Sequence, residues 1–291
     1  MEKKSFKGYL YLAPALVIIS VFVVYPLIRA VIMSFMENYN FVSGEYDGIN
    51  LNNYVSIFHD KYFIRALTNT MIYVVFVVPF SIILSLLIAV ILHSKIHFRG
   101  VFQTIYFLPY VTSTIAIGLV WKWIFNSDFG LINQVLGWFG IAPVKWLTSK
   151  EYALPSLIIF SIWRSCAFDI LIFLSALQTI PDDLYNAAKV DSTPRRRVFT
   201  RITLPAIAPM ISYAFIMGLI NAFKVYNEVY ALFGGQKAGP ANSAITVVYY
   251  IYSKFYNETA YGEAAAAAVV LFGIVLTLTI IQRTVTSRAN S

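Results

Sequence analysis

The chain has 291 residues, of which 59% are hydrophobic and only 12% are charged. Soluble domains carry about 25% charged residues, so this composition excludes an ordinary soluble domain and favours one membrane domain over residues 1–291. The formal net charge of +8 comes from scattered Lys and Arg residues, which form no basic face for nucleic acid. We therefore expect no nucleic-acid partner, and we attribute the positive charge to cytoplasmic loops.

Six apolar stretches are long enough to cross a hydrocarbon core of roughly 30 Å, which takes about 20 apolar residues. The predicted spans are residues 9–33, 64–92, 101–125, 153–177, 206–233 and 261–281. The first stretch is too long for a signal peptide and lacks a small-residue cleavage site, so we expect a retained span. The predicted fold is an all-α, polytopic membrane protein with six transmembrane helices.

The distribution of Lys and Arg predicts how the chain is oriented in the membrane. One set of ends and loops holds most of these residues: Lys3, Lys4, Lys7, Lys95, Arg99, Lys189, Arg195, Arg196, Arg197, Arg201, Arg283 and Arg288. Because cytoplasmic loops carry an excess of Lys and Arg, both termini should be cytoplasmic. The outer segment 125–147 has apolar residues at helical spacing and two tryptophans, which predicts a short helix at the membrane surface.

Metal and thiol chemistry find little support in the sequence. The single cysteine, Cys166, lies in an apolar run, so neither an intramolecular disulfide nor a thiolate cluster can form. His93 and His97 are four residues apart, but Ser94 stands where a zinc-protease motif needs glutamate, and Lys95 would repel a cation. We interpret this segment as a basic cytoplasmic loop and predict no metal site.

The cytoplasmic loop between spans four and five, residues 181–205, is polar and contains helix signals. Pro181 can open a helix, and acidic residues follow it in the first turn, where the helix dipole favours negative charge. The predicted helix runs to about Val190. Ala187 and Ala188 are small, so we expect them to lie on a surface that another protein can approach closely.

A turn and a second helix are predicted after Val190. Asp191, Ser192 and Thr193 are residues typical of caps and turns, and Pro194 can start a new helix. The second helix would carry Arg195–Arg197 as a basic flank near the lipid headgroups and would end at Leu204-Pro205. The plainer alternative is an ordinary positively charged loop.

The segment IPDDLYNAAKVDSTPRRRVFTRITLPAIAP resembles the EAA loop of the inner-membrane permeases of binding-protein-dependent ABC importers. The residues that match this pattern are Ala187, Ala188, Asp191, Phe199, Ile202, Leu204 and Pro205. Asn186 replaces the usual glutamate, and Ser192 replaces a glycine, where a serine at positive φ would be strained. Stretches such as YLYLAPALVIISVFVVYPLIRAVIMSF and GPANSAITVVYYIYSKFYN look like the carbohydrate-uptake branch, of the maltose, lactose and glycerol-phosphate first-permease type.

The resemblance implies a transporter built from several chains in the cell membrane. Its other members would be a second permease subunit in a heterodimer, two ABC ATPase subunits and an extracytoplasmic solute-binding protein that delivers a carbohydrate. This chain would be non-catalytic and bind no cofactor, because ATP and Mg²⁺ would be used by the ATPase; it also lacks a GxxxxGK[ST] phosphate loop. The residues expected to couple it to the ATPase are Tyr185, Asn186, Ala187, Ala188, Asp191, Ser192 and Arg195.

Polar residues inside the spans are candidates for the substrate path. They are Trp163, Arg164 and Asp169 in span four, and Asn221, Lys224, Asn227 and Glu228 in span five. On one continuous helix, Lys224 and Glu228 would be close enough to pair, and Asn221 would extend the same polar stripe. A structural salt bridge, or a lock between two permeases, is an alternative role for these charges.

Three kinds of transporter remain open at this point. The leading hypothesis is an ATP-driven importer of a sugar or oligosaccharide. A permease for another solute, such as glycerol phosphate, is the first alternative and would need a basic pocket. An ion-coupled secondary transporter is the second, but such carriers usually show intramembrane carboxylates and two repeated halves, whereas the spans of this sequence hold few carboxylates and no internal repeat is seen.

Overall fold

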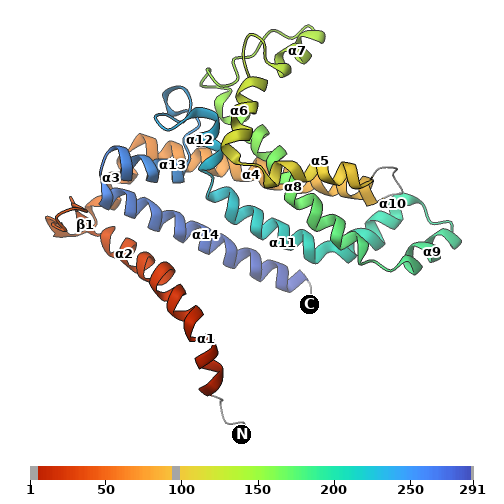
Figure 1. Cartoon of the computed structure of the whole chain (residues 1–291), viewed down its shortest axis with the longest axis horizontal. Coiled ribbons are helices and arrows are strands. Elements are labelled where there is room, and N and C mark those ends of the chain that lie inside the picture. The colour runs from red at the N-terminus through yellow and green to blue at the C-terminus, as the bar shows by residue number, and fades with distance from the viewer. Residues whose placement is uncertain (1–5, 94–98, 290–291) are drawn as a thin grey trace. The chain divides into compact units, whose positions relative to one another are not determined.

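The structure is a computed structural model that describes residues 6–93 and 99–289. The predicted cytoplasmic residues Lys3, Lys4 and Lys95, and also His97, lie outside the described residues. The described chain is mainly helical, as expected (Figure 1). One short departure from the all-α prediction is an antiparallel pair formed by β1 (Met36–Glu37) and β2 (Gly48–Ile49).

Packing divides the chain into two compact units, the first formed by residues 1–64 and 250–274, and the second by residues 65–249 and 275–291. Elements of the first unit are α1 (Phe6–Ile19), a π-helical turn (Ser20–Val24), α2 (Tyr25–Met33), β1, β2, α3 (Asn52–His59) and a second π-helical turn (Ser253–Asn257). Three helices contribute residues to both units: α4 (Lys61–His93), α13 (Val247–Tyr252) and α14 (Tyr261–Ala289).

The second unit holds the remaining helices. They are α5 (Arg99–Val111), α6 (Thr114–Ile124), α7 (Leu131–Trp138), α8 (Ala153–Gln178), α9 (Asp182–Val190), α10 (Arg195–Val198), α11 (Leu204–Phe223) and α12 (Asn227–Phe233). A π-helical turn (Phe199–Thr203) joins α10 to α11, and a 3-10 turn covers Pro240–Asn242. The short helix α7 lies within the outer segment predicted to be helical.

Five helical segments of the described chain are long and apolar enough to cross a membrane. They are Tyr11–Met33, Lys61–His93, Ala153–Gln178, Arg195–Phe223 and Tyr261–Thr284. The predicted third span, 101–125, is not one straight helix, because α5 and α6 meet at 105° around Thr112–Ser113 (Figure 1). The Thr112 hydroxyl donates to the Leu108 carbonyl over 2.7 Å, and such side-chain bonds compete with the helix ladder. The described chain therefore has six candidate spans only if α5 and α6 together are treated as one span.

The predicted fifth span, 206–233, is also wrong as a single helix. Helix α11 ends at Phe223 and α12 begins at Asn227, with Lys224–Tyr226 between them. The Val225 carbonyl, freed by this break, accepts a hydrogen bond of 2.9 Å from the buried Thr246 hydroxyl. A partner 21 residues along the chain thus satisfies this buried backbone group, which local helical propensity cannot reveal.

A lysine surrounded by carboxylates holds the first unit together. Lys254 Nζ lies 2.8 Å from Glu263, 2.9 Å from Glu258 and 3.5 Å from Asp60. The Tyr250 hydroxyl donates a further 2.9 Å hydrogen bond to Asp60. Burial alone would lower the pKa of Lys254, but hydrogen bonds and charge from Glu258 and Glu263 raise this pKa above its ordinary value. Lys254 therefore stays protonated and connects the starts of α4 and α14.

Replacing Lys254 by methionine should lower the free energy of unfolding by about 3 kcal/mol, because three carboxylates lose their shared cation. The measurement is the midpoint of thermal unfolding of the purified protein in detergent. Lys237→Met, at an exposed loop lysine, is the control and should leave the midpoint unchanged. The destabilisation caused by Lys254→Met should be smaller at low pH, because protonated carboxyl groups no longer need a cation. Equal midpoints for Lys254→Met and the wild type would rule out this role for Lys254.

Candidate functional site

A pocket of about 290 Å³ lies in the second unit, lined by residues of α4, α5, α8, α11 and α12 and of the break before α12. Six of the seven predicted substrate-path residues line it: Arg164, Asp169, Asn221, Lys224, Asn227 and Glu228. Trp163 instead is 40% exposed and packs its ring 5.3 Å from Trp121. The two chain breaks thus bring together polar residues that a pair of straight helices would have arranged as stripes.

Aromatic side chains complete the pocket wall. Tyr110 and Phe168 stack with ring centroids 5.1 Å apart and an interplanar angle of 20°, and Tyr73 lines the same pocket. These residues were not singled out from the sequence, because aromatic residues are spread throughout the chain. The position of Tyr110 just before the α5–α6 break is the one signal that could have indicated it.

Glu228 pairs with Arg164 and not with Lys224 as predicted. Arg164 Nη1 donates to Glu228 Oε1 over 2.9 Å, and Nη2 donates to the Thr114 hydroxyl over 2.7 Å. The predicted pair required Lys224 and Glu228 to lie on one helix, but the chain leaves α11 before Lys224. The Arg164 guanidinium therefore joins α8 to the first turns of α6 and α12.

The formal charges of the pocket cancel. Arg164 and Lys224 contribute two positive charges, and Asp169 and Glu228 contribute two negative charges. Arg164 and Glu228 neutralise each other directly, whereas Lys224 is exposed and Asp169 is 9% exposed. A pocket of this kind offers hydrogen-bond donors, acceptors and aromatic faces without a net attraction for an anion or a cation.

Helix α9 and the turn that follows it have the geometry predicted from the sequence of residues 181–205. Asp182 and Asp183 lie in the first turn of α9, and the helix ends at Val190. Ser192 has φ 51°, in the left-handed region where a glycine is the unstrained residue. Backbone hydrogen bonds from Ser192 to Lys189 and from Thr193 to Ala188 close the helix end in a Schellman arrangement.

The second predicted helix does not stop at Leu204-Pro205. The chain continues from Arg195 to Phe223 as one 29-residue helical segment, with a π-helical turn just before Pro205 (Figure 1). A proline inside a helix has no N–H to donate and clashes with the carbonyl four residues earlier, and a π-helical turn relieves such local conflict. The predicted basic flank is therefore the first turn of the fifth span.

The residues expected to couple the chain to an ATPase divide into exposed and inward-facing groups. Asn186, Ala187, Asp191, Ser192 and Arg195 are exposed. Ala188 is only 7% exposed, so the expectation that it forms part of the outer surface is wrong. Tyr185 also points inward, since its hydroxyl lies 3.1 Å from the Thr203 hydroxyl in the π-helical turn. The contact of these residues with an ATPase stays a prediction.

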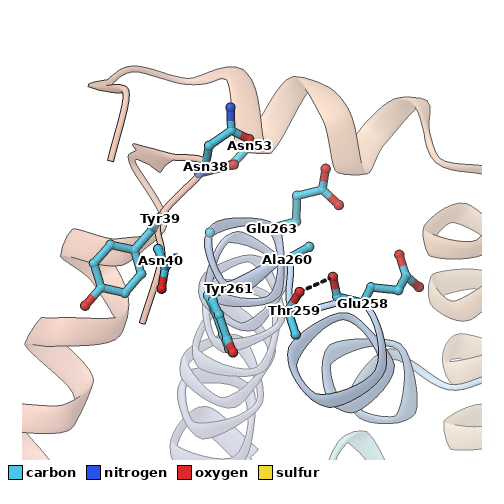
Figure 2. A pocket seen from close by; sticks show the side chains of 10 residues that line it. Asn38, Tyr39, Asn40, Asn53, Glu258, Thr259, Ala260, Tyr261 and Glu263 are labelled. Carbon is cyan, nitrogen blue, oxygen red and sulfur yellow. Dashed lines mark hydrogen bonds between the residues drawn. The ribbon is translucent and has the colours of Figure 1, made fainter. Parts of the chain in front are cut away.

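A second polar pocket, of about 500 Å³, lies in the first unit between the segment around Asn38–Asn40 and the start of α14 (Figure 2). Its polar side chains already bind backbone groups or side chains outside the pocket wall. The Asn53 amide donates to the carbonyls of Ser34 and Met36, and Glu263 binds Ser56 and Lys254. These hydrogen bonds and this ion pair therefore stabilise the first unit. Within residues 6–93 and 99–289, no group of three or more His, Cys, Asp or Glu side chains could hold a metal ion.

Comparison with known proteins decides the family. The family model "Binding-protein-dependent transport system inner membrane component" matches residues 58–290. The chain is 35% identical to the probable ABC transporter permease protein YurN of Bacillus subtilis, covering 94% of each chain. This chain belongs to the family of binding-protein-dependent transport system inner membrane components. The predicted resemblance is confirmed, and the protein is an ABC transporter permease with several apolar helices.

Other relatives of this permease, and solved structures that resemble it, are transporters of saccharides. The lactose transport system permease protein LacF of Rhizobium radiobacter is 34% identical over 92% of this chain and 91% of its own. The arabinooligosaccharides permease protein AraP of Bacillus subtilis is 34% identical, over 96% and 88%. A crystal structure of a bacterial ABC transporter that imports alginate has a TM-score of 0.82 at 26% identity, covering 99% and 97%. A second structure of an alginate transporter, bound to a periplasmic protein carrying alginate pentasaccharide, has a TM-score of 0.80 at 26% identity and covers 98% and 96%.

Proposed function

We propose that this permease moves an uncharged sugar or oligosaccharide into the cytoplasm as the membrane subunit of an ATP-driven importer. The observation that carries the substrate class is the pocket in the second unit, whose charges cancel and whose wall combines amides with stacked aromatic rings. Sugars present hydroxyl groups for such amides and apolar ring faces for such aromatics. The lactose and arabinooligosaccharide permeases among the relatives support the same class.

The two alternative functions receive less support. A glycerol-phosphate permease would need a cationic pocket, but Glu228 pairs with Arg164 and a second carboxyl group, that of Asp169, lines the same wall. An ion-coupled carrier would not need a binding protein, whereas the family of this chain is defined by one. Uptake by vesicles that is blocked by vanadate and unaffected by ionophores would support the ATP-driven importer. The opposite pattern would favour the ion-coupled carrier.

The proposed assembly has several further members. The permease would pair with a second, different permease, receive solute from an extracytoplasmic binding protein, and dock two ATPases through residues 181–205. ATP and Mg²⁺ would be used by the ATPases, and both termini of this chain would be cytoplasmic. ATPase closure would push α9 and switch the permeases between inward- and outward-facing states as rigid bodies. The exposed Asn186, Ala187, Asp191 and Arg195 support a docking role for this loop.

Changing Asn221 or Asn227 to leucine should reduce solute uptake roughly tenfold or more, because each change replaces a hydrogen-bonding amide of the pocket with an apolar group. Uptake of a panel of labelled neutral sugars is measured in vesicles that contain the assembled transporter. Asn257→Leu, at an exposed asparagine outside the pocket, is the control. Copurification of the partner subunits should be unchanged in all three variants. Normal uptake by both pocket variants would remove the substrate assignment.

A further inference from the structure

Arg164 makes contacts at two chain breaks simultaneously. It lies on the continuous helix α8, yet its guanidinium binds Thr114, the first residue of α6, and Glu228, the second residue of α12. Each of these helices begins directly after a break that interrupts an apolar span, at Thr112–Ser113 and at Lys224–Tyr226. One side chain therefore ties the starting turns of two half-helices to a third helix.

Helices α6 and α12 pack against each other without room for a larger side chain. A Cβ atom added to Gly118 of α6 would lie 2.4 Å from the Cβ of Ala231 in α12. Gly118 is buried, and Ala231 is 3% exposed. Backbones that approach this closely through small residues are held by many van der Waals contacts. The two half-helices therefore form one body. It is joined to the rest of the second unit through the two breaks and through aromatic contacts of Trp121 in α6 with Phe160 and Trp163 in α8.

We propose that Arg164 is a positioning residue that latches the α6–α12 body to α8 beside the pocket, and that this body moves as one piece when the latch opens. This proposal rests on the proposed transport function, since it assigns the latch to the alternation between two access states. The latch closes over a pocket whose wall includes Arg164 and Glu228 themselves. Opening would separate these two charges and widen the pocket on the side of α12.

The contacts of Arg164 indicate a bond that can open. Its side chain is 28% exposed and that of Glu228 is 16% exposed, so water can replace the partners when they separate. Arg164 Nε is buried and has no hydrogen-bond partner among the described residues. A buried N–H without an acceptor costs free energy, so the closed arrangement is less stable than one in which every donor of Arg164 is paired.

The latch is tested by thiol labelling of the whole transporter in intact cells. Ser165, which lines the pocket next to Arg164, is changed to cysteine as a nearly isosteric probe. A membrane-impermeant maleimide is added outside, where the predicted orientation places α6 and α12. The single native cysteine, Cys166, is buried, and the chain without Ser165→Cys gives its background. Labelling needs neither solute nor ATP, so a transporter that takes up no sugar would contradict the proposed function while leaving the latch testable.

Arg164→Met should increase the labelling rate about fivefold or more, which is the lower end of typical coupling between sites. Glu228→Gln, which preserves shape and an acceptor oxygen, should give a smaller increase and serves if Arg164→Met fails to fold. The exchange R164E/E228R should return the rate towards that of the wild type. ATP hydrolysis without binding protein should rise in parallel with labelling. Unchanged labelling in both single variants, at normal membrane yield, would contradict the latch proposal. Arg164 would then only join the three helices and would not control the opening of the pocket.

Discussion

Changing Ala188 to arginine should abolish solute uptake, with a loss of about a hundredfold or more, because a long cation would fill the pocket of about 880 Å³ that Ala188 lines beside α9. Ala188 is 7% exposed and lies in the helix that the proposed function places against the ATPase. An arginine there would add a third cation to a pocket wall that already holds Lys189 and Arg195. Uptake and copurification of the ATPase are measured on the same membranes, and both should fall.

Ala187→Arg is the matched control for this change. Ala187 is the neighbouring alanine of the same helix, but it is exposed, so an arginine there leaves the packing of α9 intact. Its membrane yield should equal that of the wild type, and any loss of uptake would reflect contact with a partner. Undiminished uptake and ATPase recovery for Ala188→Arg would contradict both the buried position and the coupling role of α9.

Changing Gly118 to leucine should prevent α6 and α12 from packing together. Even alanine would bring its Cβ to 2.4 Å from Ala231 Cβ, well inside van der Waals contact. Overpacking of this kind typically costs about 1–3 kcal/mol for small additions, so Gly118→Ala should lower thermal stability and Gly118→Leu should lower it further. Uptake should fall with the disruption of the adjacent pocket. The measurements are the unfolding midpoint in detergent and uptake in vesicles.

Gly137→Ala is the matched control for Gly118. Gly137 lies in α7, and a Cβ added there would meet nothing within 4 Å. Because alanine favours a helix over glycine by about 0.8–1.0 kcal/mol, this control should be neutral or slightly stabilising. A Gly118→Leu protein with the midpoint and uptake of the wild type would show that α6 and α12 do not form one body.

The helical class, four of the six predicted spans and the helix–turn geometry of residues 181–193 could be predicted because each depends on local sequence. Apolar length marks a span, and prolines, acidic first-turn residues and turn formers mark the ends of α9. The left-handed Ser192 also followed from its position after the helix. These features need no knowledge of what packs against them.

The broken spans and the true partner of Glu228 could not be predicted in this way. The break at Lys224–Tyr226 is supported by Thr246, and the bond between Arg164 and Glu228 joins residues 64 positions apart. Helical spacing assigned Glu228 to Lys224 because both were assumed to lie on one straight helix. The candidate residues were nevertheless gathered in one pocket, since charged groups in apolar spans tend to face an interior.

The burial of Ala188 shows a different limit of sequence reasoning. Small residues allow close approach both to a partner protein and to another part of the same chain, and spacing does not distinguish the two. Tyr185, three positions earlier on the same helix side, bonds to Thr203 and marks this side as the inner one. Ala187 and Asn186 face outward by the same geometry.

The first span differs from the others because little of it is buried by the rest of the chain. Only 6% of its most apolar window is buried, compared with 56% of the corresponding window of Ala153–Gln178. Lipid tails are as apolar as leucine, so exchanging one apolar residue for another on such a surface changes few contacts. Residues 11–33 would therefore be covered by lipid or by the second permease of the proposed assembly. Exchanging one apolar residue for another there should have little effect where lipid covers the span and should weaken subunit association where the second permease does.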